Sequence, residues 1–310
     1  MTSDAVVLSG LTREYRGARA VDGLNFRVQR GELFGLVGPD GAGKTTTLRM
    51  LAGVLRPTAG DATVLGISVA RAPERVKPHL AYMSQRFGLY ADLTVRENLE
   101  FYADLYQVPR LARPVRLERL YQFSGLGPFQ HRLAGNLSGG MKQKLGLSCA
   151  LIHEPEVLLL DEPTFGVDPI SRRDLWIIIH EMVARGTTVL VSTAYLDEAE
   201  RCDRVAFLHR GRLLAVETPA ALQQRLQGRV LAAHTSQPRG AREVLGGLPG
   251  VRRAALFGEL VHVTMDDPDA AWPRAQAALE QAGIAVHVAQ AIEPSLEDVF
   301  IELAGAGDDG

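Results

Sequence analysis

The 310-residue sequence lacks most features that mark secreted, membrane-spanning or nucleic-acid-binding proteins. It contains only two cysteines, Cys149 and Cys202, so it has no disulfide framework and a reducing cytosol is the expected compartment. No apolar run approaches the roughly 18 residues that a membrane-spanning helix needs. The N-terminus lacks the basic-then-apolar profile of a signal peptide. The formal net charge of −2 argues against the basic surface that nucleic-acid binding requires.

The composition that remains is that of an ordinary soluble globular protein. Hydrophobic residues make up 46% of the chain and charged residues 23%, which is enough apolar material for a core. The length favours two domains, with a single domain as the alternative. Through about residue 218, short apolar strands alternate with amphipathic helices, which predicts an α/β unit with a largely parallel sheet. The strands are expected at Ala5–Ser9, Leu24–Val28, Leu33–Val37, Leu80–Met83, Val157–Leu160, Thr188–Val191 and Arg204–His209.

Two regions depart from this alternation. Between Tyr90 and His153 helices replace strands, beginning with a capping box at Thr94–Glu97, which predicts a helical insert. After about Gly228 the pattern predicts a small α+β appendage whose last helix is capped by Ser295. Its strands are expected at Arg229–His234, Leu260–Met265 and Ile284–Val288, and its longer helix at about Pro273–Ala282. The expected divisions are 1–220 with a helical part at about 90–153, a linker at 221–228, an accessory domain at 229–304 and a flexible tail at 305–310.

A phosphate-binding loop is the strongest functional signal in the sequence. Residues 38–45 read G-x-x-x-x-G-K-T, directly after the apolar run Leu33–Val37 and before a helix expected from Lys44 to about Leu55. A glycine-rich turn with a chance Lys-Thr is the alternative, but it does not require a strand before it and a helix after it. Lys44 would reach the β- and γ-phosphates, and the Thr45 hydroxyl would bind Mg²⁺. The nucleotide-binding residues are expected to be Gly38, Pro39, Asp40, Gly41, Ala42, Gly43, Lys44, Thr45 and Thr46.

Two acidic residues at the end of a later strand complete a catalytic pattern. The apolar run Val157–Leu160 is followed by Asp161 and Glu162. A carboxylate at this place can hold Mg²⁺, and the next one can orient or deprotonate an attacking water. An acidic turn after a strand is common on its own, but beside a phosphate loop the catalytic interpretation is favoured. Asp161 is therefore predicted to be a metal ligand, and Glu162 a catalytic base.

A second anion-binding helix start lies between these two motifs. Leu137 is followed by Ser138, Gly139, Gly140 and Met141, which open a helix that runs to about His153. Serine and glycine at a helix N-terminus expose backbone N–H groups that bind anions. A plain serine cap with a glycine-rich turn is the alternative in isolation.

In this order the motifs resemble those of the ATP-binding cassette (ABC) family, over residues 1 to about 220. The resemblance implies an α/β P-loop NTPase cassette, with a mostly parallel core sheet, antiparallel strands and a helical subdomain, followed by the small α+β accessory domain. It implies ATP and Mg²⁺ as ligands. It also implies a head-to-tail pair of cassettes, homodimeric or heterodimeric, in which each ATP lies between one phosphate loop and the other chain's signature.

The resemblance also assigns roles to residues outside the loop. The signature (Ser138, Gly139, Gly140 and Met141) would contact the γ-phosphate held by the partner cassette. Gln85 would bind Mg²⁺ and sense the attacking water, which makes it both a catalytic residue and a metal ligand with Thr45 and Asp161. Asp168 matches the loop that couples the two sites. Tyr15 matches the family's adenine-stacking aromatic, with a half-buried strand tyrosine as the alternative.

Two positions depart from the family pattern. Met141 stands where glutamine is more common, a variant found among drug-export ATPases. Ala194 stands where the family places a histidine that contacts the γ-phosphate. Losing one preorganised donor to the transition state would cost about 3 kcal/mol, or about a hundredfold in rate. Because Glu162 is still present, hydrolysis is expected to be slow but not absent. The candidates to replace the histidine as a hydrogen-bond donor are Ser192, Tyr195 and an ordered water.

Several further segments are similar to the ATPases of bacterial drug exporters whose permeases are separately encoded. They are Gly88–Thr94, Asp168–Arg173, Leu196–Glu200 and Pro294–Phe300. The similarity implies an ATPase that is cytoplasmic and peripheral on the inner face of the membrane, bound to a permease through the region around Gln85–Asp92. Two alternatives stay open: a mainly ATP-holding regulatory cassette paired with a more active one, and a soluble non-transport protein. The accessory domain would contact or regulate the cassette, or serve only as a stabilising cap.

Overall fold

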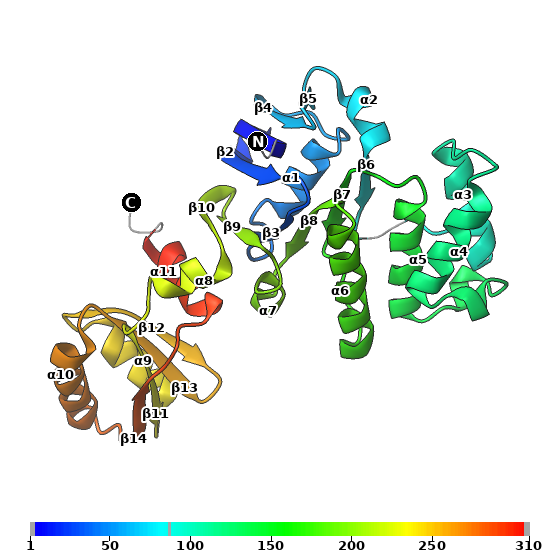
Figure 1. The fold of residues 1–310 in the computed structure, drawn as a ribbon. Coiled ribbons are helices and arrows are strands. Elements are labelled where there is room, and N and C mark those ends of the chain that lie inside the picture. Colours follow the sequence, from blue (N-terminus) through cyan, green and yellow to red (C-terminus); the bar gives the residue numbers. More distant parts are fainter. Residues whose placement is uncertain (1–3, 86–87, 307–310) are drawn as a thin grey trace. The chain divides into compact units, whose positions relative to one another are not determined.

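The computed structural model describes residues 4–85 and 88–306, and Figure 1 shows their fold. The chain forms two compact units, the first ending at Val216 and the second beginning at Glu217. This boundary falls earlier than the expected residue 220. The helix α8 (Pro219–Gln224) occupies part of the segment expected as a linker, because it packs against the last helix of the second unit.

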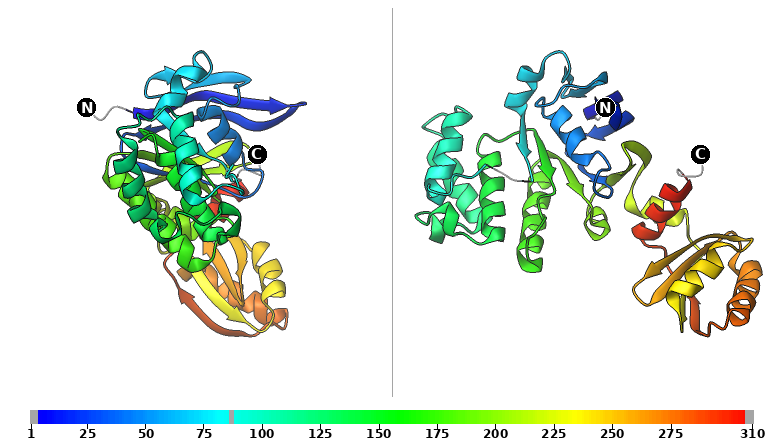
Figure 2. Two further views of the ribbon diagram at one scale, coloured as in Figure 1. Left: turned by 90° about the vertical axis from the view of Figure 1, so that its right-hand side faces the viewer. Right: turned by 180° about the vertical axis from the view of Figure 1, so that it is seen from behind.

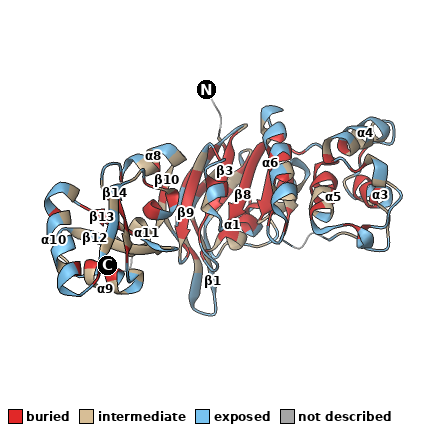
Figure 3. Cartoon of the chain, turned by 90° about the horizontal axis from the view of Figure 1, so that it is seen from below, coloured by how far each residue is buried: buried red, intermediate tan, exposed pale blue. Residues whose placement is uncertain are grey.

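A six-stranded sheet forms the centre of the first unit, with the order β10-β9-β3-β8-β7-β6. The pairs β3/β8, β3/β9, β6/β7 and β7/β8 are parallel, so the predicted mostly parallel sheet is confirmed. Every residue of β3, β7 and β8 is buried, as expected for parallel strands covered on both faces (Figure 3). The strands are β3 (Leu33–Val37), β6 (Leu80–Met83), β7 (Val157–Asp161), β8 (Thr188–Thr193), β9 (Arg204–His209) and β10 (Arg212–Glu217).

A second, antiparallel sheet of order β2-β1-β4-β5 shares a hydrophobic core with the first. That core holds apolar side chains from β1, β2, β3 and β4 around the helix α1, whose Leu48, Met50 and Leu51 are fully buried. The helix thereby fixes the loop that precedes it against both sheets. The elements are β1 (Asp4–Tyr15), β2 (Ala18–Gln29), α1 (Lys44–Leu51), β4 (Ala59–Val64), β5 (Ile67–Ser68), α2 (Pro73–Val76) and the 3₁₀ turn η1 (Lys77–His79).

The predicted helical insert is a group of three helices, which Figure 2 shows gathered beside the core sheet. It begins at Thr94, where the expected capping box is present: the Thr94 hydroxyl accepts from Glu97 N, and the Glu97 carboxylate accepts from Thr94 N. The helices are α3 (Val95–Leu105), α4 (Arg113–Ser124) and α5 (Gly139–Leu151), with 3₁₀ turns η2 (Gly127–Phe129) and η3 (Ala134–Asn136). Two more helices return to the core sheet, α6 (Pro169–Ala184) and α7 (Leu196–Ala199).

The second unit has the strand and helix order of a split β-α-β fold, βαββαβ. Its antiparallel sheet has the order β12-β13-β11-β14. The helices α9 and α10 bury one face of this sheet, and α11 contacts the other, where His262 Nδ1 lies 2.8 Å from Asp298 Oδ1. The elements are β11 (Val230–Thr235), α9 (Pro238–Gly246), β12 (Val251–Phe257), β13 (Leu260–Met265), α10 (Pro268–Gln281), β14 (Val286–Ala291) and α11 (Leu296–Ala306).

The structure differs from the sequence-based expectations in several details. The helix after the phosphate loop ends at Leu51 rather than near Leu55, because Gly53 adopts a left-handed conformation that helices do not continue through. The sequence pattern predicts neither helix α9 nor the strands β4, β5, β10 and β12, and helix α10 begins at Pro268 rather than at about Pro273. Helix α11 includes Gly305 and Ala306, which were expected to belong to the tail, while residues 307–310 lie outside the described part of the chain.

Candidate phosphate-binding site

The loop between β3 and α1 has a backbone shape that requires glycine at two of its predicted positions. Gly43 has φ +101, a left-handed value, and a Cβ there would lie 2.6 Å from the Ala20 carbonyl oxygen. A Cβ on Gly38 would lie 2.2 Å from the Leu208 carbonyl oxygen. Side chains are therefore excluded at both of these positions in the loop. An anion can then approach the backbone N–H groups of the loop without steric hindrance, as a phosphate-binding loop requires.

This loop forms one wall of a pocket of about 390 Å³. The opposite wall carries Gln85 and Glu162, so residues far apart in the sequence meet across it. Gly38 and Pro39 do not line the pocket; their carbonyl oxygens hold Lys44 instead. The lining residues are Ala20, Asp40, Gly41, Ala42, Gly43, Lys44, Thr45, Thr46, Gln85 and Glu162.

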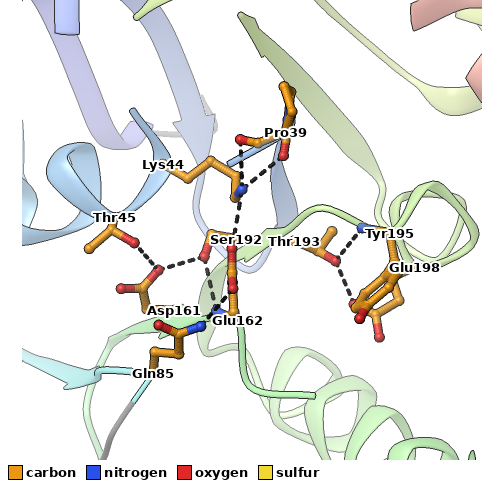
Figure 4. Close-up of polar contacts among 11 residues, drawn as sticks. Pro39, Lys44, Thr45, Gln85, Asp161, Glu162, Ser192, Thr193, Tyr195 and Glu198 are labelled. Atoms are coloured by element: carbon orange, nitrogen blue, oxygen red, sulfur yellow. Dashed lines mark hydrogen bonds and ion pairs between the residues drawn. The ribbon is translucent and has the colours of Figure 1, made fainter. Parts of the chain in front are cut away.

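The Lys44 ammonium group lines the pocket and is held by the three oxygen atoms around it (Figure 4). Its side chain is only 4% exposed, and Nζ donates to the carbonyl oxygens of Gly38 at 2.8 Å and Pro39 at 3.2 Å. Nζ also lies 3.2 Å from Glu162 Oε1. In the described part of the chain Glu162 is its one carboxylate partner, and a buried cation placed in this way in a polar pocket is suited to bind a phosphate.

Asp161 accepts hydrogen bonds from three hydroxyl groups, which belong to three different elements. Thr45 and Ser192 donate to Oδ1 at 2.9 and 2.8 Å, and Tyr82 donates to Oδ2 at 3.1 Å. Burial and the adjacent Asp161 carboxylate raise the pKa of the Tyr82 hydroxyl to about 12, although a hydrogen bond from Arg49 opposes the shift. Tyr82 therefore stays protonated and donates. The Thr45 and Asp161 oxygens already lie side by side, and they are the kind of ligand that Mg²⁺ prefers.

Glu162 is held in an unusual backbone conformation that points its side chain into the pocket. Its φ is +49, which is left-handed and uncommon for glutamate. The Glu162 N–H is fixed by the Ser192 hydroxyl at 3.0 Å and the Ser192 carbonyl at 3.2 Å. Gln85 Nε2 donates to Glu162 Oε2 at 3.0 Å. The predicted metal and catalytic residues are thus brought together in one cluster.

A smaller pocket of about 130 Å³ adjoins the site at Ala194. Its lining includes no histidine, and Asp40 and Glu162 line both pockets. Of the two side chains named above as candidate substitutes, Ser192 is fully buried and donates its hydroxyl to Asp161, whereas Tyr195 lines the pocket and is 39% exposed. The Arg172 guanidinium lies 4.7 Å from the centre of the Tyr195 ring. Tyr195 is therefore the one of these two side chains that lines the pocket.

The signature residues and Asp168 lie apart from the phosphate loop of their own chain, outside the lining of its pocket. Ser138 caps α5, accepting from Met141 N at 3.3 Å, and Ser138 and Gly139 are exposed. Asp168 caps α6 by accepting from Ser171 N at 2.9 Å, and these hydrogen bonds hold the pKa of its carboxyl group below the ordinary value. Both helix starts are thus well formed on the surface of the unit.

Tyr15 ends β1 and is 42% exposed, with the Arg13 guanidinium 4.6 Å from its ring centre. It does not line the phosphate pocket. Of the region Gln85–Asp92, expected to face a membrane subunit, residues 86 and 87 lie outside the described part of the chain.

The sequence did not identify Tyr82, Thr164, Thr193 or Glu198 as parts of the site. Tyr82 lies in β6, three residues before Gln85, and its hydroxyl reaches a strand end 79 residues away. The strand pairing of β6 with β7 is what places it beside Asp161. Only the register of the sheet could have indicated this contact.

The strand, loop and helix around Lys44, together with the acidic residues after β7, define a nucleoside triphosphate-binding protein of the P-loop class. Residues 21–165 match the family model described as ABC transporter. The chain is 37% identical over 313 positions to the daunorubicin/doxorubicin resistance ATP-binding protein DrrA of Streptomyces peucetius, covering 97% of this chain and 92% of that protein. The chain therefore belongs to the ABC transporter family, among its ATP-binding proteins.

Two further comparisons agree with this assignment. The chain is 46% identical over 315 positions to the probable multidrug ABC transporter ATP-binding protein YbhF of Escherichia coli. The match covers 98% of this chain but 53% of YbhF, so the chain spans about half the length of that relative. A solved ATP-binding subunit of an ABC transporter has a TM-score of 0.65 and 32% identity, covering 71% of this chain and 92% of that one. The predicted cassette fold is confirmed.

Within residues 4–85 and 88–306, no helix is both long enough and apolar enough to cross a bilayer.

Proposed function

We propose that this chain binds ATP with Mg²⁺ in the pocket at Lys44 and hydrolyses it to drive export through a membrane permease. The observation that carries the proposal is the convergence of Lys44, Thr45, Asp161, Glu162 and Gln85 within hydrogen-bonding distance around one pocket. These five residues come from three separate segments: the start of α1, the residues after β6 and the end of β7.

Each residue has a distinct part in the proposed reaction. Lys44 exchanges its carbonyl and carboxylate partners for phosphate oxygens, which releases Glu162 from the ion pair. Thr45, Asp161 and Gln85 would hold Mg²⁺, which would neutralise charge on the phosphates when bound. Glu162, freed and oriented by its fixed backbone, accepts a proton from the attacking water. Asp40, Gly41, Ala42, Gly43 and Thr46 supply the surrounding backbone N–H groups.

The exposed signature is proposed to complete the ATP site of a second cassette. Ser138 and Gly139 are exposed and lie outside their own chain's phosphate pocket, so they are available to another molecule. Met141 and Gly140 continue the same helix start, and Asp168 caps the neighbouring helix α6. Tyr15 would stack on the adenine at the rim.

Export is proposed from the relatives, which are named a multidrug transporter ATP-binding protein and a daunorubicin/doxorubicin resistance protein. A separately encoded permease would then bring the chain to the inner face of the membrane. A nucleic-acid partner is not proposed, since the net charge is −2.

Two measurements test the proposal. The purified chain should hydrolyse ATP in the presence of Mg²⁺, and Glu162→Gln should abolish turnover while it retains ATP binding. Equal rates for wild type and Glu162→Gln would contradict the assigned base. Co-purification from membranes should recover a multi-span permease, and recovery of ribosomes instead would support the soluble alternative.

The regulatory alternative is favoured by one observation, the absence of a histidine among the residues that line the pocket at Ala194. A regulatory cassette would bind ATP but turn it over only when paired with a second, different cassette. Tight ATP binding without turnover by the purified chain, restored by adding such a partner, would support it.

A further inference from the structure

Glu198 is a carboxylate that is completely buried beside the proposed catalytic site. Its side chain is 1% exposed and accepts two short hydrogen bonds, from the Thr164 hydroxyl at 2.6 Å and the Thr193 hydroxyl at 2.6 Å. Among residues 4–85 and 88–306, its ion-pair partner is Arg172, whose Nε lies 3.6 Å from Glu198 Oε1. Burying a charge is costly unless it is paired and hydrogen-bonded, so this arrangement requires all three partners.

The two threonines belong to the two loops that form the catalytic edge of the sheet. Thr164 lies two residues after Glu162, in the loop that leaves β7. Thr193 ends β8 and accepts the backbone N–H of Tyr195 at 3.0 Å, which fixes the turn that contains Ala194 (Figure 4). Glu198 therefore joins the loop of the proposed base to the loop of the missing histidine.

The third partner extends this cluster toward the signature. Arg172 lies in the first turn of α6, which Asp168 caps. In the same turn, Ser171 packs against Gly140 so closely that a Cβ on Gly140 would lie 2.2 Å from the Ser171 hydroxyl oxygen. A continuous set of contacts thus runs from Gly140 through the start of α6 to Glu198 and both catalytic loops.

We infer that Glu198 is a positioning residue for hydrolysis, which fixes the two catalytic loops to each other and, through Arg172, to the helix start that packs on the signature. This inference rests on the proposed function. A contact made by another molecule at Ser138–Gly140 would reach Glu162 of this chain by that route. A rigid, buried carboxylate suits this role because each of its oxygens is committed to a different loop.

The first test measures the loops themselves, without nucleotide. In Glu198→Gln, the amide nitrogen cannot accept the threonine hydroxyl that it faces, and Arg172 loses its counter-charge. Hydrogen–deuterium exchange is expected to be about tenfold faster in peptides covering 162–167 and 193–196, with the phosphate loop 38–46 unchanged. The matched control is Asp197→Asn, an exposed carboxylate on the same short helix. Unchanged exchange in both loops would overturn the inference.

The second test separates positioning from general stability. Thr193→Val should lower kcat by about fivefold or more with KM within about twofold, and Thr193→Ser, which keeps the hydroxyl, should restore it. If Glu198→Gln does not fold, this threonine pair replaces it in the exchange experiment. A kcat loss in Thr193→Ser equal to that in Thr193→Val would overturn the role of the hydrogen bond.

A double-mutant cycle tests the link to α6. Arg172→Met and Glu198→Gln should together lower kcat no further than the worse single variant, because both break one unit. Multiplicative losses would mean that they act separately and would overturn the link. If the wild type does not hydrolyse ATP, the proposed function fails, while the exchange result still decides whether Glu198 joins the loops.

Discussion

Ser192 holds Asp161 and the following residue in place at once: its hydroxyl donates to Asp161 Oδ1 at 2.8 Å and accepts from Glu162 N at 3.0 Å. The side chain is fully buried at the end of β8, directly beside Asp161 in the parallel register. The two acids of the site are therefore positioned by a neighbouring strand and not by their own loop alone.

Replacing Ser192 by alanine should destabilise the chain by about 1–2 kcal/mol, because Asp161 loses a donor in a buried position. Mg²⁺-dependent ATP binding should weaken as well. Urea denaturation and titration with a fluorescent ATP analogue measure the two effects. Ser192→Thr keeps the hydroxyl and serves as the control. Wild-type stability in the alanine variant would show that the hydroxyl does not support Asp161.

Tyr82→Phe should lose about 1 kcal/mol of stability near neutral pH, since Asp161 Oδ2 then lacks its donor. The folded-state pKa of Tyr82 is raised to about 12, above its ordinary value near 10. The contribution of the tyrosine is therefore complete below about pH 10 and is lost as the pH rises toward 12. Urea denaturation of both proteins across this range should show the difference shrinking. A constant difference would contradict the assignment.

Ala194→His should raise the ATPase rate by about ten- to a hundredfold, because it adds a donor in the small pocket beside Glu162. Ala194→Leu is the matched control, which fills the pocket without a donor. Steady-state rates at saturating Mg²⁺ and ATP measure the effect. If neither variant changes the rate, another group already supplies the hydrogen bond that the histidine would make. The single substitution Tyr195→Phe should then lower the ATPase rate below that of the wild type.

Gly140→Ala should destabilise the chain by about 1–3 kcal/mol, because the added methyl group overlaps Ser171. Gly139→Ala is its control: the nearest atom to a Cβ there is 4.0 Å away, and its stability should stay within about 0.5 kcal/mol of wild type. Thermal denaturation without nucleotide compares them. The double variant Gly140→Ala/Ser171→Gly should recover most of the loss. Equal melting temperatures for the two alanine variants would contradict the close packing.

Both cysteines should resist alkylation in the folded chain. Cys149 and Cys202 are buried, and burial raises the pKa of each thiol, so little reactive thiolate forms near neutral pH. Mass spectrometry after iodoacetamide treatment should find both unmodified, and both modified in concentrated guanidinium chloride. Rapid native labelling of either would indicate that the structure around it opens readily.

The sequence predicts best what depends on a contiguous motif. The phosphate loop, the capping box at Thr94 and the acidic end of β7 each have a residue pattern that local backbone chemistry imposes. The structure places Lys44, Thr45, Gln85, Asp161 and Glu162 together as such motifs suggest.

What the sequence leaves out depends on sheet register and weak local preference. Tyr82 reaches Asp161, and Glu198 reaches Thr164, because β6, β7 and β8 lie side by side. Helix α9 contains Gly240 and Gly246, which disfavour helices, and it is held by burying Ala241 and Leu245 against its sheet. Strand β12 lies at a sheet edge with mixed burial and shows no clear alternation.

The left-handed backbone of Glu162 has a consequence for how this protein responds to selection. Glycine or asparagine would adopt φ +49 with less strain, so a library screened only for heat resistance should enrich them at position 162. Such variants would also remove the carboxylate that lies 3.2 Å from Lys44 Nζ, so that this buried cation keeps the Gly38 and Pro39 carbonyl oxygens but loses its counter-charge. The selected variants should therefore carry a second substitution near Lys44. If they are thermostable but no longer hydrolyse ATP, Glu162 is a residue at which thermal stability and catalytic activity conflict.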